Sequence, residues 1–570
     1  TAGGGASAGA ARPELPLTIQ GAIQSRLDHL PADEKDLLKR AAVFEERFWS
    51  EALVAMGVPD PAPLLARLRR RDLVAPRPGS TLGGQTEWCF RQALVRDVAC
   101  GMLTGAQREA LHRAAAAWLE GLADGAPEAI AAQLDAAGDG AAAAPWWVRA
   151  VEAADARGDS EGVLAHSERA LPHVGDPDLL FKLHDLRYLA NYYLGRVEAQ
   201  DESMRALEAL AGRAKNVADR RSKRRRGHYL RRRGQIAEVL AFYEADLVQA
   251  RAAGDAVWEV LALSGLGGTM ADAGRPAEGQ VHTDRAVELA RRVGDPFYVA
   301  TAAEGCGYTA GVTGDAMRAY ELYREAARLY DATGDVRRAA TARSNAGVSL
   351  MVFAAWGEAK RELEASLIAC TRLGLLRTRG YALANLSQAY ANLGDFAAAR
   401  AAADESIAVA DRTKEARLRV AARYHRALVQ QLAGDHAGAR ADLQAALADP
   451  LAGPMEADMR TLLALGLLAE GDARGALAEA RRAVDLREQS GALEFLAVEM
   501  YLCAFDALAA LGRPAEARPF ATRAADLVRR RAATMNEATL RGHYLAHPPH
   551  ARALQLDGEP APPAAGAAGA

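Results

Sequence analysis

The chain has 570 residues, too many for one compact hydrophobic core, so we expect several units or a solenoid. Its 70 basic and 73 acidic residues leave a net charge of −3, which excludes a global positive field that would attract nucleic acid or an anionic membrane. Hydrophobic residues make up 50% of the chain but aromatic residues only 6%, and the abundant alanine favours helices packed closely on helices.

The first 14 residues, TAGGGASAGAARPE, are rich in glycine and alanine and are expected to form a disordered linker. The sequence starts at Thr1 without a methionine, so we expect it to be the C-terminal piece of a larger protein.

Residues 15–105 follow a pattern of their own and are predicted to form a winged-helix domain. Each helical segment is amphipathic, and the third segment leads into a fourth that ends near Leu73. A turn-rich stretch with several glycines then precedes a short strand-like run. Helices followed by a glycine-rich hairpin are the order of elements in a winged helix. Helices are expected at 15–30, 31–44, 48–57 and 60–74, the hairpin at 76–90, and a further helix at 91–103.

Internal repetition is the strongest signal in the rest of the chain. Turn residues recur in steps of 40, 40, 40, 40, 40, 37 and 41, and a second series of glycines also steps by 40. Glycine ends a helix by adopting a positive φ, and a following Asp or Pro begins the next helix. Each repeat is therefore predicted to be two helices and two turns. The first series is Gly234, Gly274, Gly314, Ala354, Gly394, Gly434, Gly471 and Gly512, and the second is Gly254, Gly294, Gly334 and Gly374.

Small side chains obey the same period at three places in each repeat. Such positions let paired helices approach until their backbones nearly touch, and a leucine at Ala439 is expected to cost about 1–3 kcal/mol by overpacking. The small residues five after the turn are Gly279, Ala319, Ala359, Ala399, Ala439, Ala476 and Ala517; those twelve after it are Ala286, Ala326, Ser366, Ser406, Ala446, Ala483 and Ala524; those seven before it are Gly267, Gly307, Gly347, Ser387, Ala427 and Ala464.

This pattern resembles the tetratricopeptide repeat, with its small residues in both helices and its Gly-x-aromatic turn at Gly394-Asp395-Phe396. HEAT repeats have this length but lack the fixed small positions, so they are the less favoured alternative. The predicted fold is all-α: a tetratricopeptide-like α-solenoid over residues 106–545, with about ten helix pairs of period about 40, preceded by the winged helix. Residues 546–570 are expected to be a disordered tail.

The N-terminal motifs carry a second resemblance. The successive runs LPLTIQGAIQSRLDHLP, DLLKRAAVF, RDLV and FRQALVRDVA, with the closing run LRGHYLAHPPHARAL, resemble the region that follows the nucleotide-binding core of bacterial STAND-type signalling ATPases. The resemblance covers residues 15 to 550, and Gln92 departs from it because relatives usually have histidine there. It implies a regulatory arm of a multidomain ATPase, linked to a serine/threonine kinase or to an adenylate or guanylate cyclase.

The chain itself lacks the motifs of an enzyme. It contains neither a G-x-x-x-x-G-K-[ST] phosphate loop nor the H-R-D and D-F-G kinase motifs. ATP and Mg²⁺ are therefore implied only for an upstream ATPase domain, and we assign no catalytic, cofactor or metal residues here. No histidine pairs with a cysteine at i, i+4 spacing, which argues against a metal site.

Six residues are candidates for a partner-binding groove. Asn345, Asn385 and His425 share one position, nine residues before the turn, in consecutive repeats. In tetratricopeptide arrays this position faces the concave groove, where asparagines clamp a peptide. The alternative, polar helix-surface residues without a ligand, is favoured. Tyr381, Gln388 and Asn392 lie on the same predicted helix as Asn385.

Two basic runs are candidates for a charged binding surface. The first, on the expected recognition helix, points to DNA contact, but a solvated face against other domains of the same chain is favoured. The second fits RNA or an acidic partner, but an exposed helix is favoured because few aromatics accompany it. The runs contain Arg67, Arg69, Arg70 and Arg71, and Arg224, Arg225 and Arg226.

The expected partners are a protein or peptide in the concave groove and upstream domains of the same polypeptide. No apolar run is long enough to span a membrane, and five scattered cysteines without CxxC spacing are typical of a reducing compartment, so we expect a cytoplasmic protein. The favoured hypothesis is a protein-binding sensor arm of a bacterial signalling ATPase. The alternative is a transcriptional regulator that binds DNA through the winged helix.

Overall fold

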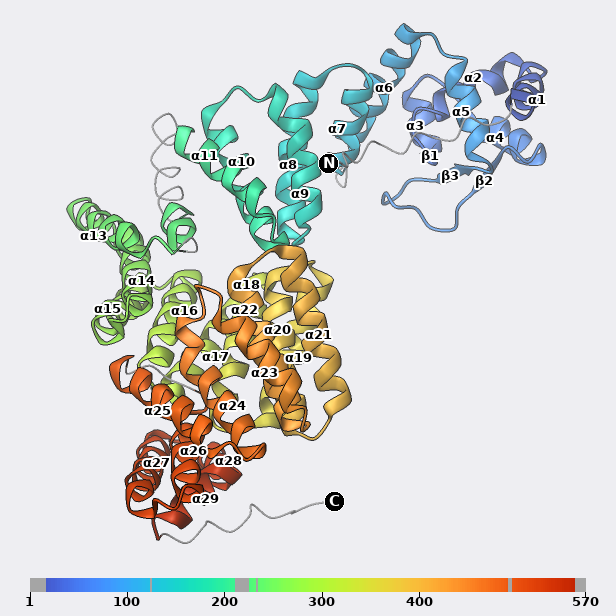
Figure 1. Ribbon diagram of the computed structural model, residues 1–570. Coiled ribbons are helices and arrows are strands. Elements are labelled where there is room, and N and C mark those ends of the chain that lie inside the picture. Colours follow the sequence, from blue (N-terminus) through green and yellow to red (C-terminus); the bar gives the residue numbers. More distant parts are fainter. Residues whose placement is uncertain (1–16, 123–125, 211–224, 232–233, 491–494, 559–570) are drawn as a thin grey trace, which may run out of the picture. The chain divides into compact units, whose positions relative to one another are not determined.

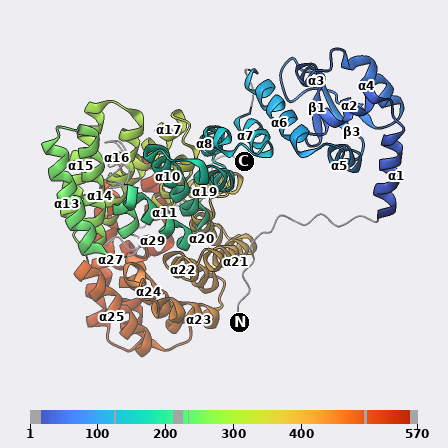
Figure 2. The same ribbon diagram turned by 90° about the horizontal axis from the view of Figure 1, so that it is seen from above.

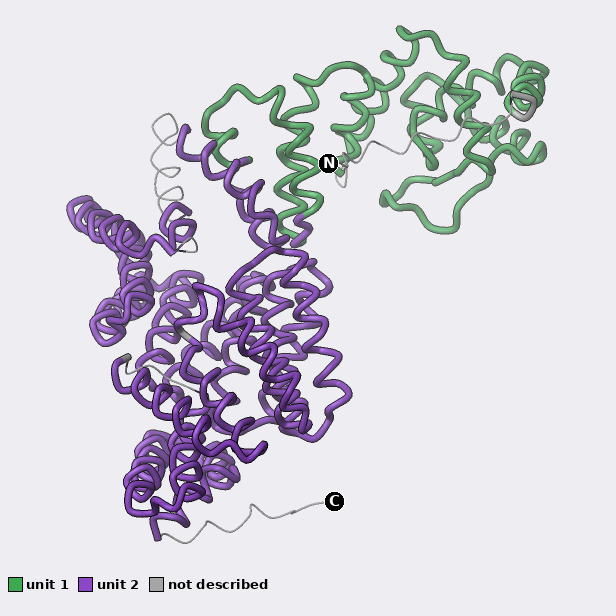
Figure 3. Tube along the Cα trace, viewed as in Figure 1, with its two compact units in different colours: residues 1–157, 161–183 green, residues 158–160, 184–570 purple. Residues whose placement is uncertain are grey.

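The computed structural model describes residues 17–122, 126–210, 225–231, 234–490 and 495–558, which are almost entirely helical (Figure 1). Contacts between residues divide the chain into two compact units (Figure 3). The first unit comprises residues 1–157 and 161–183, and the second comprises residues 158–160 and 184–570.

The first unit begins with helices around a small antiparallel sheet. Its three strands are arranged in the order β1-β3-β2, with Cys89 of β3 opposite both Arg47 and Ala75. The rings of Phe48 and Phe90 lie 5.3 Å apart in the core beneath this sheet. The elements are α1 (Leu17–Asp28), α2 (Ala32–Ala41), β1 (Arg47–Trp49), α3 (Ser50–Ala55), α4 (Pro61–Arg70), β2 (Val74–Pro76), β3 (Glu87–Phe90) and α5 (Ala93–Gly101).

The expected helix at 48–57 is wrong at its start. Phe48 and Trp49 pair with β3 as strand β1, so the helix begins only at Ser50. The aromatic pair favours a strand because both faces are covered: Phe48 lies in the core, and the Trp49 ring packs 5.8 Å from that of Phe44.

Four more helices complete the first unit, and they correct the expected boundary at residue 105. Helix α6 starts in a capping box between Thr104 and Gln107. Its Trp118 ring packs 5.6 Å from that of Trp49, so the helix shares the core of the sheet instead of starting a separate solenoid. The helices are α6 (Gly105–Glu120), α7 (Pro127–Ala136), α8 (Gly140–Ala156) and α9 (Ser160–Ala170), followed by the 3₁₀ turn Leu171–His173.

The second unit is a coil of antiparallel helices in which successive members, such as α20, α21 and α22, lie side by side (Figure 1 and Figure 2). Its helices are α10 (Pro177–Leu194, from His184), α11 (Val197–Leu210), α13 (Ile236–Ala252), α14 (Ala256–Asp272), α15 (Pro276–Val293), α16 (Pro296–Val312), α17 (Ala316–Ala332), α18 (Val336–Val352), α19 (Trp356–Arg372), α20 (Leu376–Asn392), α21 (Phe396–Thr413), α22 (Ala416–Leu432), α23 (His436–Leu447), α24 (Glu456–Ala469), α25 (Ala473–Ser490), α26 (Ala497–Ala510), α27 (Pro514–Thr534), α28 (Ala538–Ala546) and α29 (Pro548–Leu556).

Both predicted series of turn residues are confirmed. Every glycine in them has a positive φ, and Ala354 adopts the same left-handed conformation with φ of 53°. The aspartate after the turn then caps the next helix: the side chain of Asp395 accepts a hydrogen bond from the backbone N–H of Ala398. Lys414, with φ of 52°, takes the next place in the second series, which the sequence pattern missed for want of a glycine.

The predicted small residues are buried between the paired helices. A Cβ on Gly279 would lie 2.4 Å from the carbonyl oxygen of Gly267, so these two backbones are in contact. Where serine replaces alanine, its hydroxyl donates to the facing helix, as Ser366 does to the carbonyl oxygen of Ala340 at 2.8 Å. The all-α, tetratricopeptide-like solenoid is therefore confirmed, with the close helix approach that its sequence predicts.

The coil also contacts itself between helices far apart in sequence, in addition to the contacts between successive helices. The hydroxyl of Tyr192 accepts a hydrogen bond of 2.8 Å from Arg377, 185 residues away. Asn536 donates to Glu321 at 2.8 Å across 215 residues. One hydrophobic cluster accordingly joins α18 and α19 with α26, α27 and α28.

The tail expected from residue 546 differs from the structure. Helix α29 starts at Pro548, whose fixed φ suits the first turn, and buries Ala553 and Leu554 against α26 and α27. The packed region therefore reaches at least Asp557, while the expected linker at residues 1–14 lies outside the described residues. None of the helices described has the length and apolar character needed to cross a membrane.

Candidate functional site

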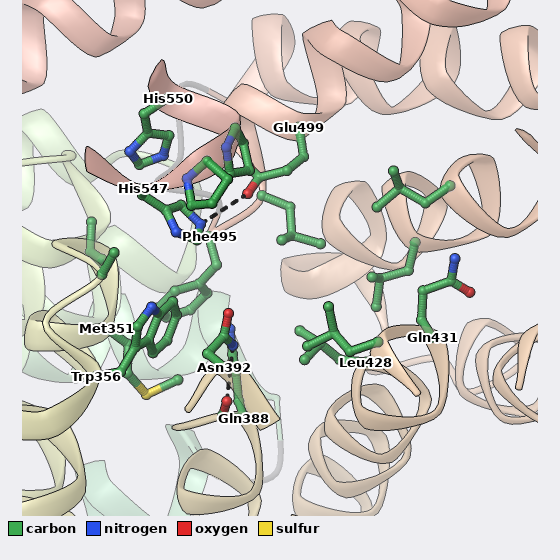
Figure 4. Close-up of a pocket in the computed structure, with 18 of the residues that line it drawn as sticks. Met351, Trp356, Gln388, Asn392, Leu428, Gln431, Phe495, Glu499, His547 and His550 are labelled. Atoms are coloured by element: carbon green, nitrogen blue, oxygen red, sulfur yellow. Dashed lines mark hydrogen bonds and ion pairs between the residues drawn. The ribbon is translucent and has the colours of Figure 1, made fainter. Parts of the chain in front are cut away.

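The inner surface of the second unit contains a cavity of about 360 Å³ near the C-terminal helices, which we call the histidine cavity (Figure 4). Trp356 and Met351 line one side of it, and Leu428 of α22 lines another. Glu499 of α26 and His547, just before α29, form its polar corner, so the cavity brings together helices from both halves of the coil.

Burial controls the charges in this corner. Burial tends to raise the pKa of Glu499, but the hydrogen bond from His547 and the nearby His550 outweigh it and lower that pKa. Burial also lowers the pKa of His550 to about 4, so this imidazole is neutral at pH 7. The three residues offer ligand atoms within 4.8 Å of one another.

A second cavity, also of about 360 Å³, is lined by six tyrosines, and we call it the tyrosine cavity. Three arginines lie among the rings, each near an acidic side chain. Arg225 pairs with Asp185 at 2.6 Å, and Arg338 lies 3.3 Å from Asp335. The tyrosines are Tyr188, Tyr192, Tyr193, Tyr243, Tyr308 and Tyr323, from α10, α13, α16 and α17.

The third arginine, Arg231, anchors the clearest polar network of the tyrosine cavity. Its guanidinium lies 2.5 Å from Asp272 and 5.0 Å from the ring of Tyr308, which also donates its hydroxyl to Asp272. Burial and the Asp272 charge raise the pKa of Tyr308 to about 12. Burial tends to raise the pKa of Asp272, but Arg231 outweighs it and keeps the carboxylate charged.

A third cavity of about 470 Å³ connects the other two, and we call it the middle cavity. It shares Tyr308, Tyr323 and Asn345 with the tyrosine cavity, and Val352 and Phe495 with the histidine cavity. The three cavities therefore lie next to one another along the second unit, with an aromatic and polar end, an apolar middle and a histidine end.

The six predicted groove residues are only partly brought together. Asn345 lines both the tyrosine and the middle cavities, and Gln388 and Asn392 line the histidine cavity. Tyr381 and Asn385 line none of these three cavities, although Tyr381 stacks at 5.3 Å on the guanidinium of Arg377.

His425 does not reach the groove. Its side chain is only 5% exposed and packs against Tyr424, with ring centroids 5.0 Å apart. Burial lowers its pKa to about 3. The repeat position was inferred correctly from the spacing, but at this repeat the helix turns the imidazole into the protein interior.

The predicted basic surface on α4 is divided by ion pairs. Arg67 lies 2.7 Å from the buried carboxylate of Glu34 on α2, and Arg71 lies 3.1 Å from it, so both arginines balance the charge of this carboxylate. Arg69 and Arg70 are exposed.

The second basic run is mostly engaged as well. Arg225 pairs with buried Asp185, and Arg226 lies 2.7 Å from Glu208 and 3.5 Å from Glu238. Arg224 lies outside the described residues. An open basic surface therefore does not form from the described members of this run.

The sequence analysis missed Glu499, His547 and His550. A search for i, i+4 pairs overlooked the i, i+3 pair of histidines in His-Pro-Pro-His, and the carboxylate comes from a helix almost fifty residues earlier. The tyrosine cavity was missed because its lining comes from many separate helices, α10, α13, α14, α16, α17 and α18 among them.

No family model matches the chain, and no curated protein matches its sequence. Several solved structures are similar. A Rap protein complexed with Competence and Sporulation Factor has 12% identity and a TM-score of 0.45, over 62% of this chain and 98% of that one. A STAND protein with a tetratricopeptide repeat sensor from Pyrococcus horikoshii has 14% identity and a TM-score of 0.42, over 79% and 68%. The quorum sensor NprR from B. thuringiensis, in its apo form, has 15% identity and a TM-score of 0.40, over 61% and 98%.

Proposed function

We propose that the second unit binds a peptide segment of a partner protein in the three connected cavities. The observation that carries this proposal is their adjacency, because Asn345 and Tyr308 line two cavities at once and Val352 and Phe495 line the next pair. An extended peptide of several residues matches a row of linked cavities better than a single compact metabolite does.

The chemistry of the lining indicates what kind of peptide fits. Tyrosine and arginine supply much of the binding energy at protein interfaces, since tyrosine rings are rigid and combine apolar area with a hydroxyl. The arginines of the tyrosine cavity already face acids such as Asp272 and Asp335, so the site does not demand a strongly charged ligand. We expect main-chain groups of the peptide to bond the tyrosine hydroxyls and the Asn345 amide, and an apolar side chain to occupy the middle cavity.

The test is selection of a peptide from a displayed random library on the purified chain, followed by titration with the labelled peptide. Replacing Asn345 by tryptophan fills the junction of two cavities and should weaken binding at least about tenfold, since an apolar side chain of the peptide loses its place. The matched control is Ile368→Ala, at a side chain that is 70% exposed. Unchanged affinity in a folded Asn345→Trp protein, or failure to select any peptide, would contradict the proposal.

We further propose that the chain is the regulatory arm of a STAND-type signalling ATPase linked to a serine/threonine kinase, with a nucleotide cyclase as the alternative output. Support comes from the N-terminal motifs and from the order α1, α2, β1, α3, α4, β2, β3, which suits a winged helix that passes on the state of the peptide site. Sequencing the gene around the segment encoding residues 1–570 tests this. We expect the upstream sequence to encode a phosphate loop and kinase motifs. An upstream reading frame that encodes an unrelated enzyme would refute the proposal.

DNA binding through the winged helix is the second candidate function, because Arg69 and Arg70 are exposed on α4. Arg67 and Arg71 are paired with Glu34, which leaves a small charged face for a DNA backbone. A filter-binding titration at two salt concentrations tests this candidate, with the double variant Arg69→Ala, Arg70→Ala as the comparison. Salt-dependent binding that the double variant loses would favour DNA over the regulatory arm.

A further inference from the structure

The polar corner of the histidine cavity has the composition of a transition-metal site. The Nε2 atom of His547 lies 3.7 Å from a carboxylate oxygen of Glu499, and the ring centroids of His547 and His550 lie 4.9 Å apart. One ligand atom from each residue falls within 4.8 Å of the others, and this is the sole such group of three found among the described residues. Figure 4 shows the three side chains converging from α26 and from the start of α29.

His550 is oriented as a metal ligand. Its Nδ1 lies 2.7 Å from the backbone carbonyl oxygen of Tyr544. A carbonyl oxygen only accepts hydrogen bonds, so Nδ1 carries the proton and the neutral ring leaves a free electron pair on Nε2. A histidine held by its other nitrogen on a backbone carbonyl is the usual arrangement around bound zinc.

Glu499 supplies an independent indication. Its Oε2 atom is buried and has no hydrogen-bond partner among the described residues. A buried carboxylate oxygen without a partner costs free energy, and a cation held between this atom and the two imidazoles would reduce that cost. The Glu499 and His547 side chains are 13% and 17% exposed, so the corner is largely shielded while remaining open to the cavity.

We propose that Glu499, His547 and His550 bind one zinc-class divalent ion, with a fourth coordination position facing the histidine cavity. Two imidazoles and one carboxylate are a known ligand set for Zn²⁺, at about 2.0–2.2 Å from the metal. Adjacent ligands of a tetrahedral ion lie about 3.3 Å apart, so the three side chains close toward one another by a small rotation when the ion binds.

The surroundings disfavour the hard cations. Ca²⁺ and Mg²⁺ need several oxygen ligands, whereas this corner offers one carboxylate and two nitrogens. Arg531 also lines the cavity, and its positive charge repels any cation there. Zn²⁺ can offset this repulsion through direct bonds to the imidazoles, whereas the hard cations cannot. The bound ion would connect α26 to His547 and to α29, in addition to packing and to the contact between His547 and Glu499. The proposal does not depend on peptide binding.

The experiment uses the full chain after treatment with a chelator, titrated with ZnSO₄ by calorimetry and checked by metal analysis. One ion per chain and a rise in the unfolding temperature are expected, with MgCl₂ producing neither. Glu499→Gln, which is nearly isosteric, and His547→Ala should each weaken zinc binding at least about tenfold. The matched control is His543→Ala on α28, a histidine near Glu358 that lies outside the cluster.

Cobalt distinguishes this site from binding at cysteine. Cys503 lies one helical turn from Glu499, but it is 1% exposed and outside the cluster. The Co²⁺-loaded chain should therefore show visible bands without the near-ultraviolet absorption of a cobalt–thiolate bond. A thiolate band, no stoichiometric zinc binding, or full zinc binding in folded Glu499→Gln and His547→Ala proteins would overturn the proposal.

Discussion

Two kinds of helix interface exist in the second unit. Between helices that follow one another in sequence, the contacts are made by buried alanine, glycine and serine, as at Gly267 and Gly279. Between helices distant in sequence, the contacts use large side chains: the hydrophobic cluster that joins α18 and α19 with α26, α27 and α28, and polar or aromatic pairs such as Arg377 on Tyr192 and His547 beside Trp356. Contacts of the first kind recur with the 40-residue period, whereas each contact of the second kind is unique and is not repeated in other helix pairs.

The difference separates stability from specificity. Interfaces of small residues gain from dispersion and apolar burial at any repeat, so they do not determine which distant helix meets which. If two distant helices met in a different alignment, a partly buried ion pair or hydrogen bond between them would lose its partner, which costs free energy. Such a contact therefore favours one alignment of the distant helices. The cavities lie where the second kind of interface is found, because large side chains hold those helices apart.

The largest expected effect comes from breaking a contact of the second kind. Arg377 lies 2.9 Å from Glu415, whose side chain is 7% exposed, and it also bonds Tyr192. Arg377→Ala removes the guanidinium that faces this buried carboxylate and should cost about 3–5 kcal/mol, measured as a shift of the urea unfolding transition.

The control for that substitution is Arg285→Ala, which removes an exposed pair with Glu288 at 3.0 Å. This change should cost less than about 0.5 kcal/mol, because exposed pairs are screened by solvent. Equal losses in the two variants would show that the distant contact has no special role.

Contacts of the first kind are tested by adding a single methyl group. In Gly279→Ala the new Cβ meets the Gly267 carbonyl oxygen at 2.4 Å, so the backbones must separate. We expect a loss of about 3 kcal/mol, observed as a lower unfolding temperature.

Gly357→Ala is the matched control, since it is also helical and its Cβ would meet no atom within 4 Å. It should stabilise the protein by about 0.5–1 kcal/mol, because alanine favours helix. A Gly279→Ala protein as stable as the Gly357→Ala protein would contradict close backbone contact.

Acid should weaken the second unit through His425. The unfolded chain takes up a proton near the ordinary pKa of about 6.5, whereas in the folded protein burial lowers the pKa of His425 to about 3. Between these values the unfolded state binds more protons, so stability falls as the pH falls. His425 alone should contribute a loss of about 2 kcal/mol at pH 5 relative to pH 8, and urea unfolding of the parent chain and of a His425 variant at both pH values measures this contribution.

His425→Leu removes this titration while keeping an apolar side chain of similar size. The variant should therefore lose less stability between pH 8 and pH 5 than the parent chain does. An identical loss in both proteins would mean that His425 is not the group responsible.

The smallest effect on stability is expected from removing an exposed hydrogen bond between distant helices. Asn536 donates to Glu321 at 2.8 Å, and both side chains are exposed. Asn536→Ala should cost less than about 1 kcal/mol, yet hydrogen exchange of α28 should rise, since one tie between α28 and the middle of the coil is lost. Exchange that rises equally throughout the chain would argue against a local tie.

The turns and the small positions could be predicted because they follow local rules. A positive φ favours glycine, and a helix approach within contact distance excludes larger side chains, so both leave a mark at every repeat. Ala354 and Lys414 show the limit of that rule, because each adopts a positive φ without being glycine. Strand β1 was missed because a pair of aromatic residues before a helix fits either element until its partner strand is known.

The candidate site could be predicted only in part for a related reason. Asn345 was chosen from its place in the repeat, and Gln388 and Asn392 were chosen because they lie on the same predicted helix as Asn385; all three line a cavity. The tyrosines of α10 and the group of Glu499, His547 and His550 belong to contacts that the repeat does not encode. Their assembly depends on how many helix pairs complete one turn of the coil, which no local pattern states.

The tie between Asn536 and Glu321 has a consequence for how this chain changes during evolution. An open array tolerates duplication or loss of one repeat, since every unit contacts only the next. Here, removing one 40-residue unit between these residues would set the last helices opposite a different part of the coil and separate the two side chains. We therefore expect the number of repeats to be constrained. Relatives that keep the contact between these two residues should differ in surface residues and turn lengths before they differ in the number of repeats.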